Sequence, residues 1–300
     1  MSSDILYLDR ITKEIQTEKV FGKAFLEASY GEGITPFFLP LIAKYSFASR
    51  LYGAFQNTSF SKKKIKPFIE EFQVDPSEFL QKPDAFSSFN DFFVRKLLPS
   101  ARPIAPGRDV AILPADGRYL VYPNIEEADG FVVKGKKFSL EELLVNKELA
   151  DSYARGSMVI ARLCPTDYHR FHFPCSCVPS VSNLLQGSLY SVNPLALRKK
   201  IEILSQNKRE ITFLQTANFG RVLFIEVGAT FVGSIHQTYC PNEPYAKGDE
   251  KGYFSFGGST LILLFEPDTI QFDQDLIDAS FSKLEVKGLM GQSLGTSLNL

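Results

Sequence analysis

The chain has 300 residues, of which 44% are hydrophobic and 22% are charged, and its formal net charge is −1. A chain of this length and composition can bury a core in one or two folded domains, which argues against intrinsic disorder. Because the charge is nearly balanced, no overall positive field would recruit nucleic acid, and we expect neither DNA nor RNA as a partner.

The N-terminal residues predict neither a secretion signal nor a membrane-spanning helix. Residues 1–19 contain an acid at position 4 and no long apolar run. The most apolar early stretch, residues 34–43, is about ten residues long and contains two prolines, whereas a spanning helix needs about 20 residues. We therefore expect a chain on the cytoplasmic side that can lie on a membrane but does not cross it.

Up to about residue 105 the pattern predicts several short helices. Apolar residues at positions 38, 41, 42 and 45 share one helical face, and Asp75 and Ser88 are candidate N-caps with an acid three residues on. A run of lysines at 62–66 precedes the aromatic residues of 67–72. This segment could meet anionic lipid headgroups. Equally, its aromatic side chains could belong to the core.

From about residue 106 the pattern changes to short β-rich runs separated by glycine, proline and asparagine turns. The expected strands are Val110–Leu113, Phe131–Lys134, Met158–Leu163, Ile211–Leu214, Arg221–Val227 and Leu261–Phe265, with helices near 140–149 and 194–204. We predict an α+β fold with a helical N-terminal, membrane-associating region (1–105) and a β-rich catalytic domain (106–300). Its sheet is expected to be antiparallel and partly barrel-like.

Phe254–Phe265 reads as one buried β-strand interrupted by Gly257-Gly258-Ser259-Thr260. Paired glycines weaken a strand and mark a bulge, a kink or a place where another group approaches the backbone. The sequence therefore raises the question of what must come close to this step.

Two of the three histidines, His169 and His172, lie within eight residues that also contain an aspartate and an arginine. Pro165 and Pro174 bracket them and favour a loop after the strand that ends near Leu163. A His-x-x-His pair could bind zinc, but no second ligand pair with suitable spacing follows, so we predict no metal. Both rings could also serve only to satisfy backbone groups.

Asp116 is the most suitable partner for one of these histidines. It lies at a predicted transition from strand to turn, where Gly117 allows a sharp bend. A carboxylate there could fix an imidazole, which could then deprotonate a hydroxyl such as that of Ser259. Such trios are common in proteins, and this one alone indicates little.

Seven segments, in order along most of the chain, carry a resemblance to one family. They are Phe86–Arg95, Ala101–Ile104, Leu113–Arg118, Tyr168–Pro174, Tyr190–Pro194, Val227–Ile235 and Lys247–Thr260. In these segments the chain resembles the phosphatidylserine decarboxylases, which are pyruvoyl-dependent enzymes. One departure is Gly257, where many members have leucine, but the following Gly-Ser pair is intact.

The resemblance implies that the chain cuts itself between Gly258 and Ser259. It further implies that Ser259 becomes a covalent pyruvoyl cofactor, which forms a Schiff base with the amine of phosphatidylserine and supports its decarboxylation to phosphatidylethanolamine. By the matching motifs, Asp116 and His172 would activate Ser259, and His169 would assist turnover of the substrate.

The same resemblance implies two associated chains, 1–258 and 259–300, bound peripherally to the cytoplasmic face of a cell membrane, where the lipid substrate lies. A homodimer of this pair is compatible with it. Segments 34–47 and 62–72 would then form monotopic helices. Two other interpretations stay open: a pyruvoyl-dependent decarboxylase of a soluble amino acid, and a lipid-binding module without catalysis.

Overall fold

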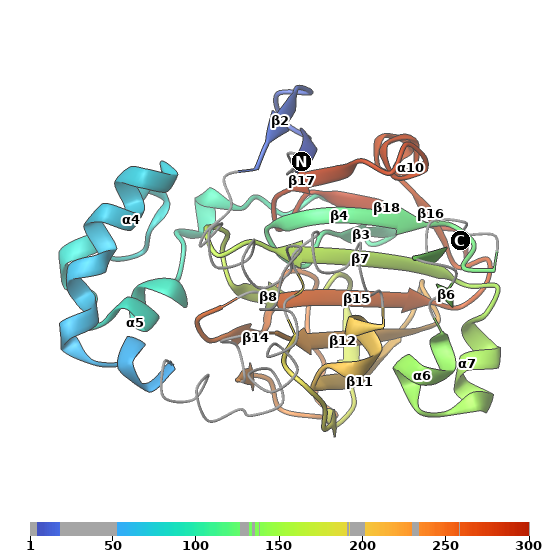
Figure 1. Cartoon of the computed structure of the whole chain (residues 1–300). Coiled ribbons are helices and arrows are strands. Elements are labelled where there is room, and N and C mark those ends of the chain that lie inside the picture. Colours follow the sequence, from blue (N-terminus) through green and yellow to red (C-terminus); the bar gives the residue numbers. More distant parts are fainter. Residues whose placement is uncertain are drawn as a thin grey trace.

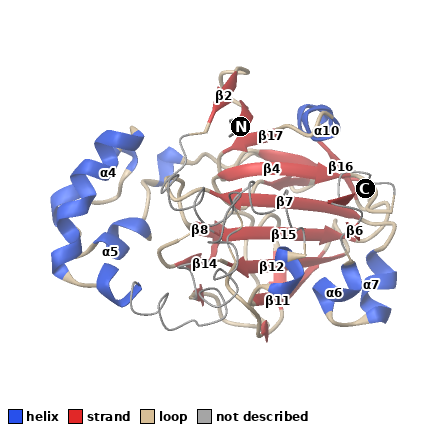
Figure 2. Ribbon diagram, in the orientation of Figure 1, coloured by secondary structure: helices blue, strands red, loops and turns tan. Residues whose placement is uncertain are grey.

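The computed structural model describes residues 5–18, 53–126, 132–133, 136–137, 139–190, 192, 202–229, 234–257 and 259–299. A large twisted sheet lies at the centre, with α4 and α5 at one end and α6 and α7 at the other (Figure 1). Figure 2 shows the same separation of strands from helices. The expected α+β class is confirmed.

The large sheet has ten strands within the described residues, in the order β10-β11-β12-β15-β7-β4-β17-β1-β2, with β9 also paired to β11. Its neighbours are antiparallel except for the parallel pair β1–β17. The strands are β1 (Leu6–Asp9), β2 (Ile15–Thr17), β4 (Gly117–Tyr122), β7 (Ser157–Leu163), β9 (Cys177–Pro179), β10 (Asn183–Leu185), β11 (Arg209–Thr216), β12 (Arg221–Gly228), β15 (Ser259–Phe265) and β17 (Glu285–Gly288).

Three smaller sheets complete the β-structure of the described residues. One has the order β13 (Ile235–Gln237), β14 (Glu250–Phe254), β8 (Arg170–His172), and another the order β16 (Ile270–Phe272), β18 (Ser293–Ser297), β3 (Val110–Ile112). A third pairs β5 (Val132–Val133) with β6 (Lys136–Lys137).

The helices are short. The α-helices are α4 (Ile65–Phe72), α5 (Phe89–Phe93), α6 (Leu140–Leu144), α7 (Lys147–Tyr153), α9 (Ile203–Gln206) and α10 (Gln274–Phe281), and the 3₁₀ turns are Ser59–Lys64, Pro76–Glu78, Pro83–Ala85 and Pro99–Ala101. Both predicted caps are confirmed, because the side chains of Asp75 and Ser88 accept hydrogen bonds from the backbone N–H groups of Ser77 and Asp91.

The central strand β15 explains why its sequence is continuously apolar. All seven of its residues are buried, with Leu261, Leu263 and Phe265 in one hydrophobic cluster and Ile262 and Leu264 in another. A strand covered on both faces cannot alternate between apolar and polar residues. The sheet therefore holds Ser259, the first residue of β15, deep inside the molecule.

Two fold predictions are wrong in the described residues. The helical pattern expected up to residue 105 fails at residues 6–17, which form β1 and β2 at one edge of the large sheet. The partner of β1 is β17, close to the other end of the chain, and no local pattern reveals such a pairing. The sheet also runs openly from β10 to β2, without the expected barrel-like closure.

The predicted interrupted strand, Phe254–Phe265, is instead the junction of two sheets. β14 ends at Phe254 in a three-stranded sheet, and β15 begins at Ser259 in the large sheet. Gly257, between them, has φ 138°, a conformation that residues with a Cβ rarely adopt. Gly257 thus lies where the chain passes from one sheet to the other.

The helices α4 and α5 enclose an aromatic cluster, formed by Phe68, Phe79, Phe86, Phe89, Phe92, Phe93 and Phe256 together with Ile65. Phe68 is buried in it and Phe72 packs against it, so the core interpretation holds for the aromatics of residues 67–72. Segment 34–47 lies outside the described residues. No helix in the described part of the chain has the length and apolarity needed to span a bilayer.

Candidate active site

Ser259 lies in the middle of the large sheet, opposite Gly228 of β12 and Leu163 of β7. Its side chain has no exposure to solvent, and its Oγ has no hydrogen-bond partner among the described residues. The hydroxyl of the neighbouring Thr260 is also buried and also has no hydrogen-bond partner among the described residues. Because buried polar groups are normally paired, two adjacent unpaired hydroxyls call for an explanation.

The connection before Ser259 is fixed by the helical region. The ring of Phe256 packs against Phe89 and Phe93, with ring centroids 5.2 Å and 4.9 Å apart. The backbone N–H of Phe256 donates to Oδ1 of Asn90 over 2.9 Å. The last residues before the predicted cut are therefore held by side chains of α5, while Gly258 itself lies outside the described residues.

His169 is fully buried directly before β8, with its ring centroid 4.0 Å from that of Phe93. Its Nδ1 donates to the Asp167 carbonyl over 3.0 Å, so the neutral ring carries its lone pair on Nε2. Burial lowers the pKa of His169 to about 4, and the carbonyls of Asp167 and Gly257 oppose this in part. The Gly257 carbonyl does not meet the geometry of a hydrogen bond, and Nε2 has no partner in the described part of the chain.

His172 ends β8, so the predicted loop is in fact a short buried strand that pairs with β14. Its Nδ1 donates to the carbonyl of Gly248 over 2.9 Å, and its Nε2 accepts from the hydroxyl of Tyr168 over 3.2 Å. The pKa of His172 is lowered, because burial outweighs the opposing effects of the hydrogen bond to the Gly248 carbonyl and of the charges of Glu250 and Asp116. Both histidines are therefore held neutral, each with an unprotonated Nε2.

Asp116 directly precedes β4 and is buried. Its carboxylate accepts from Nε and Nη2 of Arg102, at distances of 2.6–3.1 Å, and from the backbone N–H of Met290 over 2.9 Å. No hydrogen bond joins Asp116 to His172 among the described residues. The carboxylate acts on His172 through space, since its charge raises the pKa of that ring.

Sequence reasoning missed the residues that hold this site. Arg102 fixes Asp116, Tyr168 occupies Nε2 of His172, and Phe93 contacts both His169 and Phe256. All three lie within the segments that carry the family resemblance, and these segments were the only indication in the sequence that they belong to the site. Their contacts could not be predicted from the sequence, because most of them join residues that are far apart along the chain.

The site residues lie in the part of the chain that is similar to known proteins. Residues 89–296 match the family model described as phosphatidylserine decarboxylase. The chain belongs to the phosphatidylserine decarboxylase family. It is 49% identical to the phosphatidylserine decarboxylase proenzyme of Chlamydia pneumoniae over 291 residues, which cover 97% of each chain. It is 47% identical to that of Chlamydia muridarum over 298 residues, covering 98% of each, and 48% identical to that of Chlamydia felis over 292 residues.

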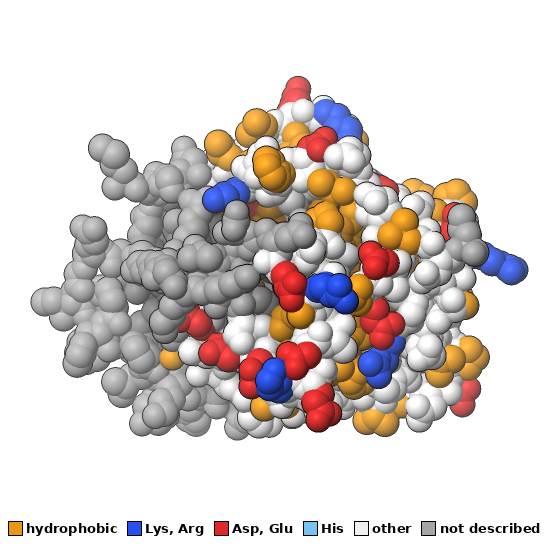
Figure 3. Space-filling view, turned by 90° about the vertical axis from the view of Figure 1, so that its right-hand side faces the viewer, with side chains coloured by type: hydrophobic (Ala, Val, Ile, Leu, Met, Phe, Trp, Pro, Cys, Tyr) orange, Lys and Arg blue, Asp and Glu red, His pale blue; other side chains and the backbone are white. Residues whose placement is uncertain are grey.

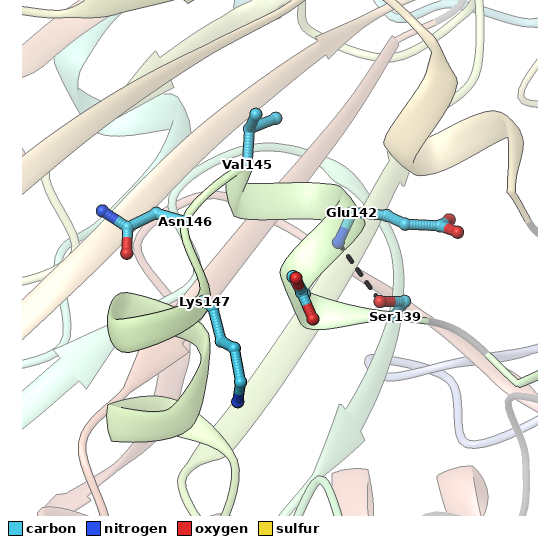
Figure 4. Close-up of a pocket in the computed structure, with 6 residues that line it drawn as sticks. Ser139, Glu142, Val145, Asn146 and Lys147 are labelled. Atoms are coloured by element: carbon cyan, nitrogen blue, oxygen red, sulfur yellow. Dashed lines mark hydrogen bonds between the residues drawn. The ribbon is translucent and has the colours of Figure 1, made fainter.

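The part matched to the phosphatidylserine decarboxylase family contains α5, both histidines and Ser259. A surface pocket elsewhere does not belong to this site. It is lined by residues 139, 141, 142 and 145–147 between α6 and α7, at the opposite end of the sheet from α5 (Figures 1 and 4). Ser139 there accepts from the backbone N–H of Glu142, an ordinary helix cap.

Within the described residues, no group of three or more His, Cys, Asp or Glu side chains could hold a metal ion. The four cysteines are free, and Cys164, Cys175 and Cys177 are buried.

Proposed function

We propose that this chain is the proenzyme of a phosphatidylserine decarboxylase that cuts itself between Gly258 and Ser259. As a member of this family the chain is a carboxy-lyase, which converts phosphatidylserine to phosphatidylethanolamine and CO₂. The observation that supports self-cleavage is the buried hydroxyl of Ser259, which has no hydrogen-bond partner within the described residues and follows Gly257-Gly258 in the sequence.

Self-cleavage requires the Ser259 hydroxyl to reach the carbonyl carbon of the preceding residue. A base removes the proton from Oγ, and Oγ bonds to that carbon. The C–N bond then breaks and nitrogen takes up a proton, which leaves an ester. Loss of the Cα proton of residue 259 then breaks its Cβ–Oγ bond, which expels Gly258 as a carboxylate and leaves a dehydroalanine. This group tautomerises to an imine, and water hydrolyses the imine to a carbonyl and releases ammonia. The positive φ of Gly257 suits such a contorted approach.

Asp116 and His172 are the proposed acid and base of this reaction. The Nε2 lone pair of His172 now accepts from Tyr168 and would take the serine proton. A positive charge on that ring would be stabilised by Asp116, whose charge raises the pKa of His172. Arg102 and the Met290 N–H hold the carboxylate in place.

The residues present fit a pyruvoyl group at position 259, because the hydroxyl there forms no hydrogen bond that its loss would break within the described residues. This group supplies a carbonyl that can take up the electron pair released with CO₂. His169 is the proposed proton carrier in turnover. Its Nε2 is unpaired in the described part of the chain, and the Gly257 carbonyl is near enough to influence its pKa.

The two chains would stay together after the cut. The proposed small chain, 259–300, supplies β15, which is paired along its length with β12 and β7 of the proposed large chain. It also supplies β17 between β4 and β1, and β18 beside β3. Separating the chains would break ladders in two sheets at once.

We further propose peripheral binding at the cytoplasmic face of the membrane, through the N-terminal half of the chain. The acyl chains of the substrate stay in the bilayer, because each CH₂ transferred to water costs about 0.8 kcal/mol. Phe60 is 74% exposed, and Lys62 and Lys63 beside it are also exposed. On the face at the right-hand side of Figure 1, acidic and basic side chains are mixed with scattered hydrophobic ones (Figure 3).

The double variant Phe60→Asp/Lys63→Glu tests the membrane contact. We expect weaker binding to vesicles that contain phosphatidylserine, with self-cleavage unchanged. The control is Phe281→Asp, since Phe281 is 91% exposed at the end of α10, outside the proposed surface. Equal vesicle binding by both variants would remove this surface from the proposal.

Intact mass and a denaturing gel test the proposed function. The wild type should give fragments 1–258 and 259–300, the second without a free amino terminus, and should release CO₂ from phosphatidylserine but not from free amino acids. Ser259→Ala should stay whole and inactive. His172→Ala should stay uncut, whereas His169→Ala should be cut but turn over slowly. An unbroken wild-type chain that still decarboxylates its lipid would refute the proposal.

A further inference from the structure

Arg95, just after α5, is a buried arginine with unused hydrogen-bond donors. It is 4% exposed, and its Nη2 donates to the carbonyls of Thr166 and Asp167 over 3.2 Å and 3.3 Å. Its Nε and Nη1 are buried and have no acceptor within the described residues. An unpaired buried donor costs free energy, and a charged one costs more.

Three other buried arginines of the described chain have acceptors for their charge. Arg102 binds the carboxylates of Asp116 and Glu78, and Arg170 binds that of Glu250. Arg209 has no carboxylate partner, but its three nitrogens all donate to backbone carbonyls. Arg95 differs from each of them, because it has neither a carboxylate partner nor a full set of carbonyls.

The carboxylates around Arg95 are already engaged. Asp116 and Glu78 are bound by Arg102, and Oδ1 of Asp167 lies 3.4 Å from Nη1 of Arg118. Burial lowers the pKa of Arg95 to about 10, so the guanidinium stays charged at neutral pH. Among the described residues, Arg95 therefore has neither an anion of its own nor a full set of carbonyl acceptors for its charge.

This charge lies beside the candidate active site. The carbonyl of Asp167 accepts from Nη2 of Arg95 and also from Nδ1 of His169. The guanidinium carbon is 5.2 Å and 5.0 Å from the ring centroids of Phe79 and Phe92, which hold it in the aromatic cluster. Five of the unpaired buried atoms belong to Arg95, His169, Ser259 and Thr260.

We propose that Arg95 binds an oxyanion of the phospholipid headgroup, either its phosphate or its carboxylate, when the substrate enters this site. The inference rests on the proposed function. A guanidinium presents its N–H groups as a planar fork that matches two oxygens of a phosphate or carboxylate, and it is less strongly hydrated than an ammonium. The donors of Arg95 that have no acceptor among the described residues would then bind the substrate, which carries an anion.

The test uses the full chain in vesicles of phosphatidylcholine with increasing mole fractions of phosphatidylserine. Wild type, Arg95→Met, Arg95→Lys and the control Arg155→Gln are first checked by mass for self-cleavage. Arg155 is exposed after α7, so its loss matches the change in charge away from the site. Failure of the wild type to cut itself or to release CO₂ would refute the proposed function, and only a working wild type allows Arg95 to be judged.

Arg95→Met should be cut normally, and its kcat/KM should fall about 100-fold, in the range for losing one partner of a buried charge pair. The loss should appear mainly in KM, and Arg95→Lys should recover part of it. A merely structural role would lower kcat and melting temperature without this recovery. Unchanged KM in Arg95→Met would overturn the proposal, as would a folded variant that stays uncut. Should Arg95→Met fail to fold, unchanged KM in Arg95→Lys would overturn it.

Inhibition by phosphatidylethanolamine separates the two anions, because this lipid has the phosphate but lacks the carboxylate. If Arg95→Met weakens this inhibition as much as it raises KM, Arg95 binds the phosphate. If inhibition is unchanged while KM rises, it binds the carboxylate. Both results support an oxyanion site at Arg95.

Discussion

The two sides of the proposed cut are held in different ways. On the upstream side, Phe256 is held by the rings of Phe89 and Phe93 and by the side chain of Asn90, and Gly257 has a positive φ. On the downstream side, β15 is paired with strands on both edges and buried on both faces. We infer that the upstream side sets the geometry of the proposed cleavage, whereas the downstream side keeps the two product chains together.

One buried ion pair connects the two sides. Nζ of Lys251 in β14 lies 2.5 Å from Oε1 of Glu226 in β12, and both side chains are fully buried. Lys251 also donates to Thr212 and Gln237. β14 precedes the proposed cut, and β12 pairs with β15, which follows it, so this ion pair fixes one side of the proposed cut relative to the other.

Lys251→Met should have the largest effect on stability. It leaves Glu226 buried without its cation, which we expect to lower the free energy of unfolding by about 4 kcal/mol. Denaturant unfolding of the Ser259→Ala chain, which cannot cut itself, measures this without a change in covalent state. The double variant Lys251→Met/Glu226→Leu should recover much of the loss. Equal instability of the single and double variants would show that an uncompensated charge is not the cause.

Leu263→Ala tests the downstream side alone. Leu263 is 1% exposed in the middle of β15, and its truncation should cost about 3 kcal/mol of unfolding free energy through lost burial and a residual cavity. The time course of self-cleavage should stay unchanged. Leu80→Ala is the matched control, since Leu80 is 56% exposed and should have little effect. Slower cleavage in Leu263→Ala would remove the proposed division between the two sides.

The pKa of His169 predicts how stability depends on pH. Its folded value of about 4 lies below the ordinary value of 6.5, so the unfolded chain binds more protons between these pH values. The free energy of unfolding should therefore fall as pH drops from 6.5 to 4, with about 3 kcal/mol coming from this residue. In the uncut Ser259→Ala background, His169→Gln should show a shallower fall. Parallel curves with and without His169 would contradict this pKa.

The sequence predicted the long, mostly apolar strands of the large sheet better than the others. Met158–Leu163, Arg221–Val227 and Leu261–Phe265 lie within β7, β12 and β15. Strands buried on both faces are mostly apolar, so these runs are recognisable although Arg162 and Glu226 interrupt two of them. β14 and β1 escaped prediction. β14 contains two charged residues and a glycine, and β1 pairs with a strand about 280 residues away.

Contacts between distant segments also limited the prediction of the site. Sequence motifs identified Asp116, His169, His172 and Ser259 as candidates but gave no reason to single out Arg95. Its unpaired donors become visible only when the carboxylates of distant segments are found with other cations. Charge balance inside a protein is a property of the fold, and so the pattern of residues along the chain does not disclose it.

Phe256→Ala tests the upstream side of the proposed cut, and its expected effect is smaller. Removing the ring frees the connection from α5, and a misplacement of about 1 Å can slow a positioned reaction about 100-fold. Appearance of the fragment 259–300 over time measures the rate. Phe256→Leu refills part of the space and should cleave faster than Phe256→Ala, while Phe281→Ala should match the wild type because that ring is exposed. If Phe256→Ala cleaves at the wild-type rate although its melting temperature falls, the aromatic contact stabilises the fold without positioning the peptide. The geometry of cleavage would then depend on the backbone of Gly257 and on the start of β15.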